Sequence, residues 1–230
     1  MIENYELNEI FLEVARKYNY DSFSKNQLIA QFEELDELKI KWERTCSSIK
    51  FIVSDYLRDA PKKVLHNIAE LLMCRVTNSY PPSKNLMTDY ISSKEFRTLN
   101  LDTYLSRHKV LYTGNGKRVP IQKIYDNLLK KMHMENDHET TLAWFCDPSD
   151  ESLNHCSSAF KTIFVSTSLD DESIPVEVLE YALLDGIACI SMGMSADPEE
   201  VRKLSIEMRR TYPEKEKVFT WTSEHKLWIW

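Results

Sequence analysis

An aspartate and a cysteine stand one helical turn apart in a strongly apolar segment, "VLEYALLDGIACISMG" (178–193). Valine, leucine and isoleucine recur there at helical spacing, so Asp185 and Cys189 should lie on one face of one helix. Carboxylate and thiolate both coordinate zinc, and Glu199 or Glu200 of the following helix could complete a mixed metal site. The other interpretation is a polar aspartate at a cleft and a small thiol packed like alanine. Gly186 between them costs the helix about 1 kcal/mol relative to alanine.

Two further groups and one loop contain residues that could do chemistry. His155 and Cys156 adjoin, but neighbours on an extended chain point to opposite sides, so we expect no dyad and a solvated loop histidine. We expect His133 and His138 at the polar end of a helix and in its loop. The loop "GNGK" (114–117) lacks the strand-to-helix context of a phosphate loop and is expected to form a turn.

Composition and charge indicate an ordinary water-soluble chain. Of the 230 residues, 43% are hydrophobic and 28% charged, and no apolar run approaches the roughly 20 residues of a membrane span. The net charge of −7 disfavours a general nucleic-acid surface, although 106–109 and 114–118 are locally basic. Five cysteines without a CxxC pair predict reduced thiols. With an acidic N-terminus unlike a signal or transit peptide, we expect a cytoplasmic protein.

The hydrophobic periodicity predicts an α+β fold in which helices predominate. Helices are expected over 7–18, from Ser24 onward, over 61–78, from 121 and from Pro198, and strands over 48–57, 140–147 and 160–169. The last two strands should form a hairpin or lie side by side, separated by a polar loop. No internal repeat is evident. In the tail, Trp221, Trp228 and Trp230 are expected to fold back onto the core.

The proline-rich break at 78–84 suggests the domain boundary. We expect residues 1–79 to form a helical N-terminal segment with one strand, and residues 80–230 to form the second, larger domain.

Three segments carry a resemblance to a known family: "KWERTCSSIKFIVSDYLRDAPKKVLHNIAELL" (41–72), "FVSTSLDDESIPVEVLEYALL" (164–184) and "VRKLSIEMRRTYPEKE" (201–216). Together with the order of elements, they resemble the SprT-like zinc metallopeptidases, and more narrowly the archaeal relatives with a helical segment ahead of the peptidase-like domain. The resemblance covers most of the chain from about residue 35 and implies a zincin-like domain at 80–230.

The resemblance also implies where the family keeps its zinc site. After "VLEYALL" the family reads HExxH, whose two histidines bind zinc and whose glutamate acts as general base. Here Asp185 and Cys189 replace the histidines and Gly186 replaces the glutamate. The third ligand would fall within 195–201, which contains no histidine.

Glycine cannot accept a proton from a bound water, so hydrolysis by the family mechanism is not expected. We therefore expect a pseudoenzyme without cofactor that binds or scaffolds a protein partner through the former substrate cleft. The alternative is a metal-dependent hydrolase whose zinc site is rebuilt from Asp185, Cys189, Glu199 and Glu200. Nucleic acid and membrane are not expected as partners.

Overall fold

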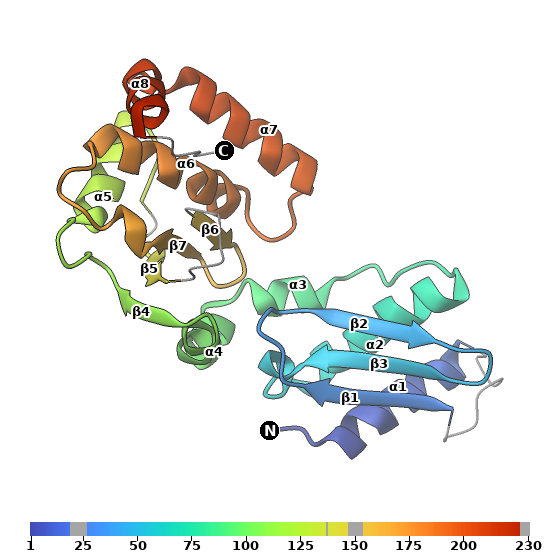
Figure 1. Cartoon of the computed structure of the whole chain (residues 1–230). Helices are drawn as coiled ribbons and strands as arrows, with labels where there is room; N and C mark the ends of the chain where they lie inside the picture. The colour runs from blue at the N-terminus through green and yellow to red at the C-terminus, as the bar shows by residue number, and fades with distance from the viewer. Residues whose placement is uncertain (19–26, 137, 147–153, 226–230) are drawn as a thin grey trace. The chain divides into compact units, whose positions relative to one another are not determined.

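The computed structural model describes residues 1–18, 27–136, 138–146 and 154–225 (Figure 1). Over these ranges the chain contains eight α-helices and two small sheets of three and four strands, so the fold is α+β as predicted. The chain divides into two compact units, Met1–Tyr104 and Leu105–Trp230. Among the described residues no helix is long and apolar enough to cross a membrane.

The first unit is a three-stranded sheet with helices. Its elements are α1 (Asn4–Lys17), β1 (Leu28–Glu33), β2 (Ile40–Arg44), β3 (Ile49–Ser54), α2 (Lys62–Thr77), α3 (Leu86–Ile91) and most of α4 (Lys94–Arg107). The strand order is β1-β3-β2, with β1 parallel and β2 antiparallel to β3. The helix predicted over 7–18 is confirmed as α1, and its buried face contains the apolar residues at helical spacing, Leu7, Ile10, Phe11, Val14 and Ala15.

The prediction of a single strand in this unit is wrong, and so is the helix expected after Ser24. Residues 19–26 lie outside the described ranges, but Leu28–Glu33 forms strand β1. Its side chains alternate between buried and partly exposed with period two, as a strand requires. The side chains of Asn4 and Asn8 on α1 accept hydrogen bonds from the backbone N–H groups of Phe32 and Ala30 at 2.9 and 2.8 Å. Ser24 and Gln27 have the spacing of a capping box, which favours a helix here, and the pairing of this segment with β3 and α1 outweighs that local preference.

The break at 78–84 is a turn inside the first unit, so the units divide after Tyr104 and not after residue 79. Asn78 ends α2 in the left-handed conformation. The buried side chain of Asn67 on α2 donates to the carbonyl of Lys84 at 2.9 Å and accepts from the N–H of Met87 at 3.2 Å. These two hydrogen bonds fold the following segment back onto α2.

The second unit is a four-stranded sheet with helices over one face. Its elements are β4 (Val110–Thr113), α5 (Ile121–Lys131), β5 (Thr141–Phe145), β6 (Asn154–Ser157), β7 (Thr162–Ser166), α6 (Val176–Met192), α7 (Pro198–Thr211) and α8 (Lys215–His225). The strand order is β4-β5-β7-β6. Strands β5 and β7 are neighbours as predicted, but they run parallel and are not a hairpin.

The core of the second unit lies between its sheet and helices α5 and α6. Leu142, Trp144, Ile163 and Val165 alternate along β5 and β7 and pack with the apolar residues of α5 and α6. Helix α6 lies between the sheet and helices α7 and α8 (Figure 1). Trp221 of α8 is partly buried against this core, as expected, whereas Trp228 and Trp230 lie outside the described residues.

The two units repeat one topology, which corrects the expectation that the chain has no internal repeat. In each, a helix is followed by three strands, of which the first is parallel and the second antiparallel to the third. The third strand ends in a serine, and a short 3-10 turn and a proline then precede a long buried helix. The shared sequence is Val-Ser-x-x-Leu, then Pro-x-x-Val-Leu, at Val53 to Leu65 and at Val165 to Leu179. The loop before the proline is longer in the second unit, which obscures the match.

Candidate functional site

Helix α6 carries the positions that the family resemblance singles out. It starts after Pro175, whose fixed backbone suits a helix start, and is buried along most of its length. One side of α6 faces β6 and β7 and another faces α7. Asp185 therefore meets α7, Gly186 meets β7 and Cys189 meets β6.

Gly186 packs directly against Ile163 of strand β7. A Cβ atom at this position would lie 2.7 Å from Cγ2 and 2.8 Å from Cγ1 of Ile163. Real Cβ atoms essentially never approach other heavy atoms this closely. Ile163 is fully buried and cannot swing into solvent. Close packing of α6 on β7 therefore explains why glycine occurs at position 186. A glutamate could be accommodated at this position only if strand β7 or the Ile163 side chain moved.

Asp185 is held by helix α7. The Ser205 hydroxyl donates to one carboxylate oxygen, and the Arg209 guanidinium pairs with the other. The Arg209 side chain is only 16% exposed and lies 5.4 Å above the Tyr181 ring. Both oxygens are thus engaged by the protein itself, and the aspartate ties α6 to α7.

Cys189 pairs with Cys156 of strand β6. The two thiols are hydrogen-bonded, and the Cys189 sulfur also accepts from the backbone N–H and the hydroxyl of Ser158. The hydrogen bond from Cys156 and those from Ser158 lower the pKa of Cys189 against the opposing effect of burial. The pKa of Cys156 is raised by its hydrogen bond to Cys189, by burial and by the charge of Asp185. Sequence reasoning named both cysteines but did not connect them.

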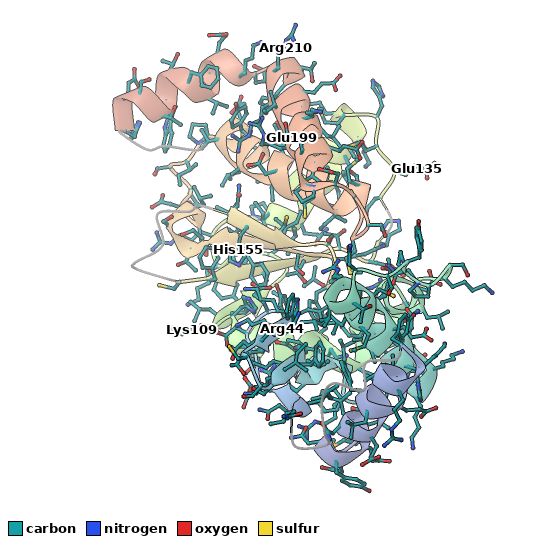
Figure 2. The ribbon with its side chains drawn as sticks, turned by 90° about the vertical axis from the view of Figure 1, so that its right-hand side faces the viewer. Arg44, Lys109, Glu135, His155, Glu199 and Arg210 are labelled. Carbon is teal, nitrogen blue, oxygen red and sulfur yellow. The ribbon has the colours of Figure 1, made fainter. Side chains whose placement is uncertain are left out.

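The two glutamates proposed as further ligands start helix α7. Glu199 is paired with Arg202 at 3.1 Å on the exposed surface, and Figure 2 shows it at the opposite end of α7 from Arg210. The first residue of α7 that contacts Asp185 is Ser205, six positions after Glu199, which is about 9 Å along the helix axis. Among the described residues no group of three or more His, Cys, Asp or Glu is placed to hold a metal ion. The structure therefore does not assemble the four-residue ligand set.

His155 lies in strand β6 and not in a solvated loop, which corrects that expectation (Figure 2). Its ring stacks on Phe164 at 4.2 Å and meets the edge of Phe145 at 4.9 Å. Cys156 points to the other face, toward α6, so the expected opposite orientation of the two neighbours is confirmed. His133 and His138 are exposed after the end of α5, as predicted.

The "GNGK" loop is a turn built around an internal carboxylate. Asp170 accepts hydrogen bonds from the backbone N–H groups of Lys117, Arg118 and Val119 at 2.8 to 2.9 Å and from the Tyr112 hydroxyl at 2.7 Å. Burial alone would raise the pKa of Asp170, but the tyrosine hydroxyl and these N–H groups hold it below its usual range. The row of N–H groups that could cradle a phosphate is therefore already occupied.

A buried acidic residue was not singled out from the sequence. Glu180 is 4% exposed and is bound by Lys131 at 2.5 Å and by the Tyr212 hydroxyl. Burial and the contact with Glu180 raise the pKa of Tyr212. The cluster joins α6 to α5 and to the end of α7. The sequence does contain a sign of this cluster, because Glu180 is a charged residue within the otherwise apolar segment "VLEYALL".

Comparison of the chain with protein-family models, with curated proteins and with solved structures finds no match.

Proposed function

We propose that this chain is a catalytically inactive relative of the SprT-like zinc metallopeptidases. The observation that carries the proposal is Gly186, packed against Ile163 where the family mechanism needs a glutamate. A general base must lie within hydrogen-bond reach of the water it activates, and this position has neither a side chain nor room for one.

The neighbouring positions support the same proposal. In the family these two residues would be neutral imidazoles free to bind zinc. Here Asp185 is neutralised by Arg209, and Cys189 is hydrogen-bonded to Cys156 and Ser158. A metal ion would have to displace these partners and then find further ligands. Each substituted residue instead contributes to holding α6 against its surroundings.

A chain without the hydrolytic groups can still act through binding. We propose a binding or scaffolding role for the surface around α6 and α7, where the family accommodates its substrate, with a protein as partner. The net charge of −7 disfavours nucleic acid. The free cysteines favour a reducing compartment, so we propose the cytoplasm as its location.

The proposal is tested with the purified full chain and casein as an unstructured polypeptide probe. Zinc is supplied in one series and a chelator in the other. No chelator-sensitive cleavage is expected, because Gly186 supplies no general base where the family mechanism needs one. Cleavage that the chelator abolishes, and that is lost in Asp185→Ala, would overturn the proposal and favour a rebuilt metal site.

A further inference from the structure

The thiols of Cys156 and Cys189 face each other across the boundary between strand β6 and helix α6. Cys156 lies opposite Ile163 in the β6–β7 ladder, and Ile163 in turn contacts the backbone at Gly186. Cys189 follows Gly186 by one helical turn, so the two cysteines meet at the same place.

A second contact fixes the register of the strand on the helix. The side-chain amide of Asn154, two residues before Cys156 and on the same face of β6, donates to the carbonyl of Ala182. Ala182 lies two helical turns before Cys189. Strand β6 is thus anchored along α6, and the thiol–thiol hydrogen bond follows from that alignment.

The pair differs from ordinary core cysteines in surroundings and access. Both side chains are partly exposed. Ser158 donates its backbone N–H and its hydroxyl to the sulfur of Cys189, so this thiol lies among polar groups and not among aliphatic side chains alone. The proposed binding role uses neither thiol.

We propose that Cys156 and Cys189 form a redox-active dithiol that closes to a disulfide on reaction with a peroxide. The Cys189 thiolate attacks one oxygen of the peroxide, the O–O bond breaks, and Cys189 becomes a sulfenic acid while hydroxide leaves. The Cys156 sulfur then attacks the sulfenic sulfur, the S–S bond forms, and water leaves with the Cys156 proton. Two thiols are oxidised by two electrons in total, and one peroxide is reduced to two molecules of water.

The disulfide would clamp β6 to α6 beside Gly186. This inference does not depend on the proposed inactivity, since the dithiol could be oxidised in an active or an inactive protein.

The experiment treats the reduced full chain with hydrogen peroxide, blocks remaining thiols with an alkylating reagent and maps the peptides by mass spectrometry without reduction. The expected product is one cross-linked peptide pair containing Cys156 and Cys189, formed at doses that leave the exposed Cys46 and Cys146 alkylated. Absence of that pair, or earlier oxidation of the two exposed cysteines, would overturn the proposal.

Two matched variants test the order of the steps. In Cys156→Ser the cross-link cannot form, and Cys189 should accumulate as a sulfenic acid that a dimedone probe traps. In Cys189→Ser the same probe should label Cys156 several-fold less. Equal labelling in the two variants would contradict Cys189 as the attacking residue. The mapping on the unaltered chain decides the disulfide even if a variant fails to fold.

Discussion

Replacing Gly186 with alanine has two opposing effects on stability: alanine has the higher helix propensity, but its methyl group would collide with Ile163. Alanine is favoured over glycine inside a helix by about 1 kcal/mol. The added methyl group would lie 2.7 to 2.9 Å from three carbon atoms of Ile163. Overpacking of a well-packed core costs about 1–3 kcal/mol. We therefore expect Gly186→Ala to lower the free energy of unfolding by about 1 kcal/mol, although the same change stabilises an unobstructed helix.

A double-mutant cycle with Ile163→Ala tests this explanation, because that substitution removes all three of the contacting carbon atoms. Alone it should cost about 2–5 kcal/mol, as buried isoleucine-to-alanine changes do. In that background the methyl group of Gly186→Ala enters the vacated space, so the helical preference remains and the conflict disappears. The effect of Gly186→Ala should then change sign to a gain of about 1 kcal/mol, a coupling of about 2 kcal/mol.

Urea denaturation followed by circular dichroism and tryptophan fluorescence measures the cycle. Val165→Ala is the matched control: it removes buried methyl groups from the same strand, but Val165 is not among the atoms nearest to the Gly186 Cβ position. Its effect should add to that of Gly186→Ala. A stabilising Gly186→Ala in the unaltered background, or additive effects with Ile163→Ala, would refute the packing explanation for the glycine.

Three further predictions concern the contacts around α6 and the loop that caps the sheet. Arg209→Ala should destabilise the protein by about 1–3 kcal/mol, because the half-buried Asp185 loses its counter-ion and keeps only the hydrogen bond from Ser205. Asp185→Ala should cost much less in the Arg209→Ala background than in the unaltered chain, and additive costs in urea denaturation would contradict the ion pair. Asp170→Asn should cost about 1.5–3 kcal/mol at neutral pH. The folded-state pKa of Asp170 lies below 3.8, so the stability that its carboxylate contributes is present above pH 3.8 and is lost as the pH falls through the folded-state pKa. The Asp170→Asn variant should therefore lose less stability on acidification than the unaltered chain. An identical dependence of stability on acid pH in the two proteins would count against this hydrogen-bond network. Closing the disulfide between Cys156 and Cys189 should raise the free energy of unfolding by about 3–4 kcal/mol, and a melting temperature unchanged by oxidation would argue that the bridge is strained.

Strong helical periodicity made several elements predictable. The helices over 7–18 and 61–78 and the helix from 121 are present because each carries an apolar face that the fold buries. Strand β3 was predicted from its β-branched and aromatic residues.

The short strands could not be predicted in the same way. The sequence predicts a helix where β1 lies, because Ser24 and Gln27 have capping-box spacing. The alternation of buried and exposed side chains along β1 becomes visible only in its pairing with β3. Strands β2 and β6 are short and mostly polar, and their pairing with β3 and β7 alone makes them strands. The domain boundary was misplaced because a proline-rich turn resembles a linker when its hydrogen bonds are not visible.

The candidate site was predictable in position and not in its contacts. Asp185, Gly186 and Cys189 stood out because their types do not suit a plain core helix. Their partners come from segments far apart in the chain, and no spacing rule connects Cys189 to Cys156 or Asp185 to Arg209. Such pairings depend on how α6 lies against β6 and α7, which only the folded chain determines.

The amount of zinc bound per chain decides whether helix α6 still carries a metal site. The full chain is purified without chelator and without a metal-affinity step, incubated with zinc, desalted and measured by elemental analysis. We expect no stoichiometric zinc, because Asp185 and Cys189 are already engaged by Arg209 and Cys156. About one zinc per chain, lost in both Asp185→Ala and Cys189→Ala, would contradict it and would place a working metal site on α6.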